Sequence, residues 1–155
     1  HYTAVRSLIG FMPFDGDCKA LAAKLSPPIT ITEAKQAVAL LEKLDLIKKE
    51  NGGRYVLCDS HISTGQKCHS LAGRTYQKEM IALARESLER HKKDLRHITT
   101  LTMSMNKEAL EDVREMAVEF YQAVKKRIDR IEDQESVYQL NLQIFPLSQN
   151  VKEEK

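Results

Sequence analysis

The tripeptide Asn51-Gly52-Gly53 constrains the fold of this chain more than any other feature, because it forces a tight reversal of the backbone. Apolar Ile47 lies before it, and Tyr55, Val56 and Leu57 follow it. Asn-Gly and Gly-Gly supply the positive φ angles that short hairpin turns require. The sequence therefore predicts a β-hairpin centred on these three residues.

Three short helices are predicted before this hairpin. Apolar residues recur every three or four positions in residues 2–11, in residues 18–25 and, most regularly, in residues 33–44. Asp15 or Asp17 can begin the second helix, and Thr30 or Thr32 can cap the third. Three helices followed by a hairpin, with the longest helix third, is the order of a winged helix-turn-helix. We therefore expect a winged-helix domain over residues 1–60.

The C-terminal half predicts a helix, a strand, a second helix and a second strand. A polar linker is expected at residues 61–66, and one long helix over residues 66–94. Residues His97–Met105 and Val137–Leu147 alternate apolar and polar side chains, which is typical of strands. Between them, Asn106 can cap a helix that continues to about Ile131.

A strand, a helix and a strand in succession predict a parallel βαβ unit. Two strands alone are seldom stable, so we expect a second copy of the chain to complete the sheet. The predicted class is α+β: an N-terminal winged helix-turn-helix and a C-terminal α-β-α-β module, residues 67–148, that forms a homodimer. Residues 149–155 are expected to be a disordered tail.

Two resemblances support this architecture. The stretch CKALAAKLSPPITITEAKQAVALLEKLDLIKKENGGRYVL resembles bacterial winged-helix regulators in its layout of helix-turn-helix and wing. Nearly the whole chain is similar to a bacterial family of uncharacterised predicted regulators, known as a domain of unknown function, through LLEKLDLIKKE, RHITTLTMSMN and VYQLNLQIFPLS in this order. This likeness implies a transcriptional regulator, although a shared fold does not itself establish a function.

A winged helix that binds DNA places its third helix in the major groove and its wing on the backbone or minor groove. Polar residues that lie off the apolar stripe of the third helix, or that flank the wing turn, are therefore the expected contacts with double-stranded DNA: Thr30, Thr32, Lys35, Gln36, Lys43, Lys48, Lys49 and Arg54. Gln36 suits adenine, and Lys35 suits guanine or phosphate. Glu33 and Glu42 share this exposed surface and oppose phosphate binding.

Two other functions stay open. The winged helix can instead dock a protein partner within a larger assembly, and the polar row Gln139, Asn141 and Gln143 can line a small-molecule site. The basic residues of the range 90–97 can extend a DNA surface, although cations at the end of a helix also favour its dipole.

Composition narrows the remaining classes. The chain is 42% hydrophobic and 30% charged; residues 1–97 hold 16 Lys and Arg against 11 acids, and residues 98–155 hold 8 against 11. A mildly basic N-terminal part permits DNA binding. No apolar run approaches the ~20 residues of a membrane span, and three cysteines without a Cys-x-x-Cys pair favour a reducing compartment. We expect a cytoplasmic protein, with residues preceding His1 in the full-length chain.

Chemistry-bearing motifs are scarce. Four possible zinc ligands, Cys58, His61, Cys68 and His69, have a spacing that fits no standard finger, so ordinary packing is the preferred interpretation. The chain has no phosphate-binding glycine loop, no His-Glu-x-x-His and no nucleophile elbow. We therefore expect no enzyme, no metal and no cofactor.

Overall fold

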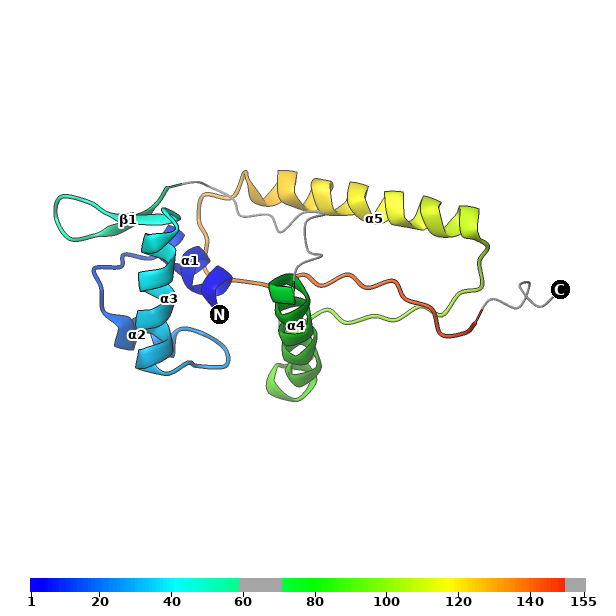
Figure 1. Ribbon diagram of the computed structural model, residues 1–155, viewed down its shortest axis with the longest axis horizontal. Coiled ribbons are helices and arrows are strands. Elements are labelled where there is room, and N and C mark those ends of the chain that lie inside the picture. Colours follow the sequence, from blue (N-terminus) through cyan, green and yellow to red (C-terminus); the bar gives the residue numbers. More distant parts are fainter. Residues whose placement is uncertain (59–70, 150–155) are drawn as a thin grey trace. The chain divides into compact units, whose positions relative to one another are not determined.

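The computed structural model describes residues 1–58 and 71–149. It divides into two compact units, His1–Cys68 with Glu132–Tyr138, and His69–Ile131 with Gln139–Lys155 (Figure 1). The predicted linker 61–66 lies outside the described residues, as does nearly all of the predicted tail 149–155. No helix in the described ranges is long and apolar enough to cross a membrane.

The first unit contains three helices and one hairpin, in the predicted order. The elements are α1 (Tyr2–Phe11), α2 (Cys18–Ala23), α3 (Ile31–Lys43), β1 (Ile47–Lys49) and β2 (Tyr55–Leu57). Asp17 caps α2 by accepting hydrogen bonds from the N–H groups of Lys19 and Ala20. Of the two threonines predicted to cap α3, Thr30 does so. Both caps satisfy backbone donors that have no partner inside the helix.

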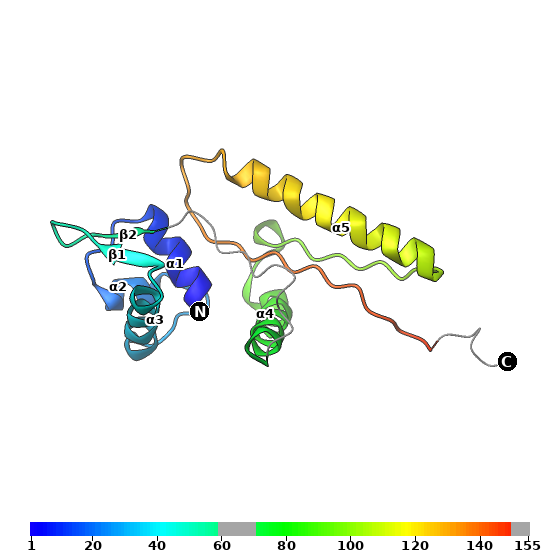
Figure 2. The same ribbon diagram turned by 45° about the horizontal axis from the view of Figure 1, so that its top comes forward.

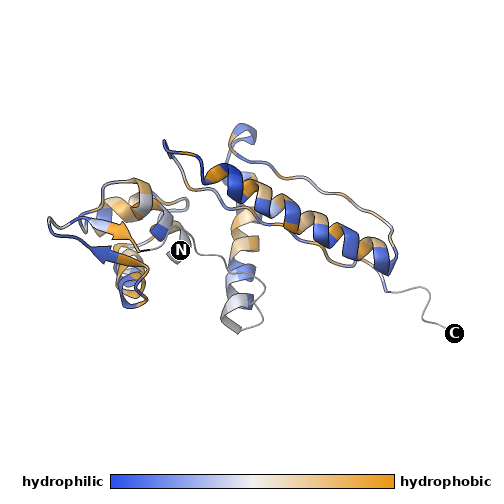
Figure 3. Ribbon diagram, turned by 90° about the horizontal axis from the view of Figure 1, so that it is seen from above, coloured by the Kyte–Doolittle hydropathy of each residue, from blue (hydrophilic) through white to orange (hydrophobic). Residues whose placement is uncertain are grey.

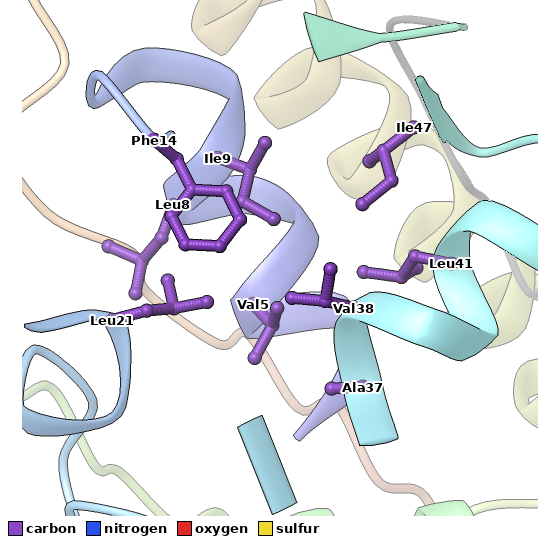
Figure 4. Packing of buried hydrophobic residues seen from close by; sticks show 9 residues of the cluster. All are labelled: Val5, Leu8, Ile9, Phe14, Leu21, Ala37, Val38, Leu41 and Ile47. Atoms are coloured by element: carbon purple, nitrogen blue, oxygen red, sulfur yellow. The ribbon is translucent and has the colours of Figure 1, made fainter. Parts of the chain in front are cut away.

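A single apolar cluster holds these elements together (Figure 4). It joins one face of α1 and one face of α3 to the loop before α2, to α2 itself and to the first strand. Its members are Val5, Leu8, Ile9, Phe14, Leu21, Ala37, Val38, Leu41 and Ile47. All nine side chains are buried. Since α3 contributes its apolar stripe to this core, its opposite face is left for solvent or a partner.

The hairpin forms where the glycine turn predicts it. Its strands are antiparallel, with Ile47 opposite Leu57 and Lys49 opposite Tyr55. Gly52 and Gly53 have φ angles of +123° and +87°, which side-chain-bearing residues rarely adopt. The N–H of Tyr55 also donates to the carbonyl of Phe14 at 2.8 Å, which ties the hairpin to the loop after α1.

The second unit contains two long helices. They are α4 (Leu71–Arg90) and α5 (Lys107–Ile128), with a 3₁₀ turn, η2 (Lys93–Leu95), between them. Asn106 caps α5 through the N–H of Ala109, as predicted. The predicted helix 66–94 ends earlier, at Arg90; there the Arg96 side chain donates to the carbonyl of His91, and the chain tightens into the 3₁₀ turn. Residues 66–70 lie outside the described part.

The prediction of strands at His97–Met105 and Val137–Leu147 is wrong for the single chain: neither range forms a strand there. The described residues form one sheet, and it contains β1 and β2 alone. Alternating side chains fit a strand, but a strand exists only when a second segment accepts and donates its backbone hydrogen bonds. Residues 97–105 and 139–146 nevertheless run in the same direction, opposite to α5, in Figures 1 and 2. The fold is thus mixed helix with a small antiparallel sheet, an α+β arrangement.

Candidate nucleic-acid interface

Helix α3 presents a mostly uncharged ridge on the side opposite the core. Counted at about 100° per residue from the centre of its buried face, Thr32, Gln36 and Lys43 lie about 150–170° away. Ala39 lies between them on the same side, and all four side chains are exposed. The small Ala39 leaves room for a partner to approach the helix backbone, with Gln36 and Lys43 on either side.

Thr30 has a structural role at the start of α3. Its hydroxyl accepts the N–H of Glu33 at 3.2 Å, while Oε2 of Glu33 accepts the N–H of Thr30 at 2.8 Å and its hydroxyl at 2.7 Å. This reciprocal arrangement is a capping box. The hydrogen bonds that Glu33 accepts lower its pKa, and the bond from the Thr30 backbone N–H has the largest effect. A DNA contact by Thr30 would compete with the hydrogen bonds that start the helix.

Lys35 lies on a flank of α3 rather than on its ridge. It is about 110° from the centre of the buried face. Its positive charge acts on the Cys18 thiol at the start of α2: burial raises the pKa of this thiol, and the lysine partly opposes that rise.

The acids that oppose phosphate binding, Glu33 and Glu42, also lie on the flanks of α3. Each is about 90° from the centre of the buried face, on opposite sides. Glu33 accepts hydrogen bonds at the start of the helix. The pKa of Tyr55 is raised first by burial and then by the Glu42 carboxylate. Both acids therefore act on other residues of the first unit.

The hairpin carries the remaining predicted contacts. Lys48, Lys49 and Arg54 are exposed around the turn, and the two lysines line an open hollow with Glu50 and Asn51. The ammonium of Lys49 lies 5.5 Å from the centre of the Tyr55 ring, which holds it near the strand by a cation–π contact. The hairpin thus carries three exposed cations and one exposed acid, Glu50.

Sequence reasoning missed the residues that position this hairpin. Phe14 is 2% exposed, and its ring centre lies 5.1 Å from that of Tyr55. Together with the bond from the Tyr55 N–H to the Phe14 carbonyl, this contact ties β2 to the core. The available signal was an aromatic residue between Pro13 and Asp15, in a segment otherwise typical of a loop.

We call the set Thr32, Gln36, Lys43, Lys48, Lys49 and Arg54 the α3–hairpin face.

The other candidate sites gain little from the structure. Cys58 is exposed, whereas His61, Cys68 and His69 of the possible zinc site lie outside the described residues. The described residues contain no cluster of three metal-binding side chains. In the basic range 90–97, Arg90 pairs with Glu86 and Arg96 with the His91 carbonyl. In the polar row, Asn141 donates to the Met80 carbonyl of α4 at 2.9 Å and accepts from Gln139 at 3.1 Å.

Comparison with known proteins places the chain at the level of a family. The family model described as "Domain of unknown function (DUF4423)" matches residues 1–147. No curated protein and no solved structure gives a significant match.

Proposed function

The chain belongs to the DUF4423 family of domains of unknown function, and we propose that it is a winged-helix transcriptional regulator that binds double-stranded DNA as a homodimer. The observation that carries the proposal is the α3–hairpin face. An exposed ridge with Gln36 and Lys43 lies on the helix that follows α2, and a hairpin with three exposed cations follows that helix.

The chemistry of this face suits DNA. Gln36 can bond an adenine edge through both ends of its amide, and Lys43 can reach guanine or phosphate. Lys48, Lys49 and Arg54 suit phosphate oxygens, which fix the position of a protein on the duplex without reading the sequence. Because Glu33 and Glu42 lie on the flanks, the ridge itself carries no negative charge. The anchoring of β2 by Phe14 supports a hairpin that keeps its position beside the helices.

A second function, the docking of a protein partner, is favoured by a specific observation. Ile31 and Leu44, at the two ends of α3, are 45% and 54% exposed. Exposed apolar residues at both ends of a helix suit a protein surface better than a phosphate backbone. A DNA-binding regulator should bind duplex DNA without a protein partner, whereas a protein-docking module should not.

Fluorescence anisotropy with a labelled random duplex, measured over a series of salt concentrations, tests the proposal. We expect the logarithm of the binding constant to fall steeply with the logarithm of salt concentration, since bound phosphates release counterions. The variant Lys43→Ala/Lys48→Ala/Arg54→Ala should bind more weakly, with a slope shallower by about one for each phosphate contact that is lost.

A matched variant removes the same charge elsewhere. Lys107, Lys126 and Arg130 are exposed on or just after α5, so changing all three to Ala should leave the salt slope unchanged. Equal loss in both triple variants would attribute binding to net charge rather than to the α3–hairpin face. A folded protein that does not bind the duplex at about 50 mM salt would contradict the proposal and favour protein docking.

A further inference from the structure

The second unit exposes the apolar surface that a folded unit normally buries. Among its described residues Met80 is the one buried hydrophobic side chain, whereas Leu101, Phe145 and Met116 are 78%, 68% and 65% exposed. In the part of the chain that the structure describes, neither α4 nor α5 packs extensively against another helix or strand. Figure 3 shows hydrophobic residues recurring along α5 among hydrophilic ones. The stripe predicted for α5 is thus present and only partly covered, and no described helix or strand packs extensively against it.

The two segments on either side of α5 also lack backbone partners. No backbone N–H or carbonyl of residues 97–105 or 139–146 bonds to another part of the described backbone. Both segments alternate apolar and polar residues, and neither contains Lys, Arg, Asp or Glu. Proteins that leave a strand edge exposed to water usually protect it with charge or with a bulge. Uncharged segments of this kind are normally paired.

Large apolar side chains of both segments are exposed, among them Met103 at 44%, Leu140 at 45% and Leu142 at 56%. Exposed apolar surface of this kind marks a region that another chain covers.

We propose that residues 97–105 and 139–146 pair with the same segments of a second copy of this chain, so that the second unit folds as an interlocked dimer in which each copy completes the sheet of the other. A second copy is favoured over an unrelated protein because uncharged, alternating segments offer no charge pattern to select a different partner, while strands of like sequence match in register and in side-chain face. The stripe of α5 would then cover the apolar side of the shared sheet.

The bond between Asn141 and the Met80 carbonyl fits this arrangement. It directs a polar side chain of the second segment toward α4. Because successive side chains of a strand point to opposite faces, Leu140 and Leu142 would point away from α4 once the segment is paired. The inference specifies how the homodimer of the proposed function forms, but it does not depend on DNA binding.

Hydrogen exchange of the full chain, combined with a mass measurement by light scattering, tests the proposal. We expect twice the chain mass of 17.7 kDa, and amide exchange in both segments slowed by on the order of a hundredfold or more relative to an unstructured chain. A monomer, or a dimer in which both segments exchange as fast as unstructured chain, would overturn it.

Proline variants test the pairing itself. Successive N–H groups of a strand point to opposite edges, so Leu142→Pro and Gln143→Pro each remove a donor from a different edge. We expect at least one Pro variant to have a dimer dissociation constant about tenfold or more above that of the Ala variant at the same position. Equal dissociation of the Pro and Ala variants at both positions would contradict strand pairing. If the Pro variants do not fold, amide hydrogen exchange of the two segments in the unaltered chain decides whether they are paired. Anisotropy with DNA is a separate readout, so a dimer that binds no duplex would refute only the proposed function.

Discussion

Asp45 has a left-handed backbone conformation, which residues with a side chain seldom adopt. Its φ is +53°, and among the described residues no other non-glycine has a positive φ. It ends α3: its N–H donates to the Glu42 carbonyl at 3.0 Å, and the N–H of Leu46 donates to the Leu41 carbonyl at 2.9 Å. A left-handed residue at this position is how helices commonly close, and glycine is the residue that fits it best. The Asp45 carboxylate also lies at the negative end of the helix dipole.

Asp45→Gly should therefore stabilise the first unit. We expect the free energy of unfolding to rise by about 1 kcal/mol, because the change removes both the strain and the unfavourable charge. Urea denaturation of the full chain measures it. Asp45→Ala is the matched variant: it also removes the charge, but its Cβ keeps the strain, so it should not reach the stability of the Gly variant. Equal stability of the two variants would show that the backbone conformation contributes nothing.

At this scale the sequence predicts what is local and misses what is not. Thr30 and Asn106 were recognisable as caps because a cap depends on a side chain and a backbone N–H two or three residues away. The contact of Phe14 with Tyr55 joins residues far apart in sequence, and no local rule identifies it. The effect of Glu42 on the pKa of Tyr55 also joins residues distant in sequence, so local rules do not predict it either.

Among the elements, α3 depends most on its first turn. Its capping box lowers the pKa of Glu33 below the ordinary value of 4.5. A carboxylate whose pKa is lower in the folded state stabilises that state at pH values above its unfolded pKa, and loses this contribution as the pH falls through the folded pKa. The ionised form of Glu33 should therefore stabilise α3 at neutral pH and not in acid.

Glu33→Gln isolates this contribution. The amide can still accept the bond from the Thr30 N–H but carries no charge. We expect the variant to be less stable than the unaltered chain at pH 7, and the difference to shrink as the pH falls below 4.5. Thermal unfolding over a pH series measures it. Glu50→Gln, which changes an exposed acid of the hairpin turn, should show no such convergence; a pH-independent difference for Glu33→Gln would refute the account.

Helices and hairpin were predictable because their hydrogen bonds connect residues close in sequence. The spacing of apolar residues in 33–44 and the Asn51-Gly52-Gly53 turn were sufficient for α3 and for β1–β2. The end of α4 at Arg90 was not, because its position depends on a side-chain bond from Arg96. The strands predicted at His97–Met105 and Val137–Leu147 have no partner strand among the described residues. Their alternation is a property of the sequence, but their pairing is not.

At the scale of the whole molecule, the two units have complementary tasks under the proposals made above. The first has its own apolar core and presents the α3–hairpin face. The second leaves its apolar residues exposed and its extended segments unpaired, as expected of a module completed by a second copy. A dimer of this kind would carry two α3 helices related by twofold symmetry.

Such symmetry makes a specific prediction for DNA. Selection from a pool of duplexes with randomised sequence, followed by sequencing of the bound fraction, tests it most directly. We expect an inverted repeat whose half-site centres lie one helical turn, about 10–10.5 base pairs, or a multiple of it apart. The variant Lys43→Ala/Lys48→Ala/Arg54→Ala should not enrich it. Recovery of no motif, or of a single unsymmetrical site, would contradict a dimeric regulator that reads DNA through α3.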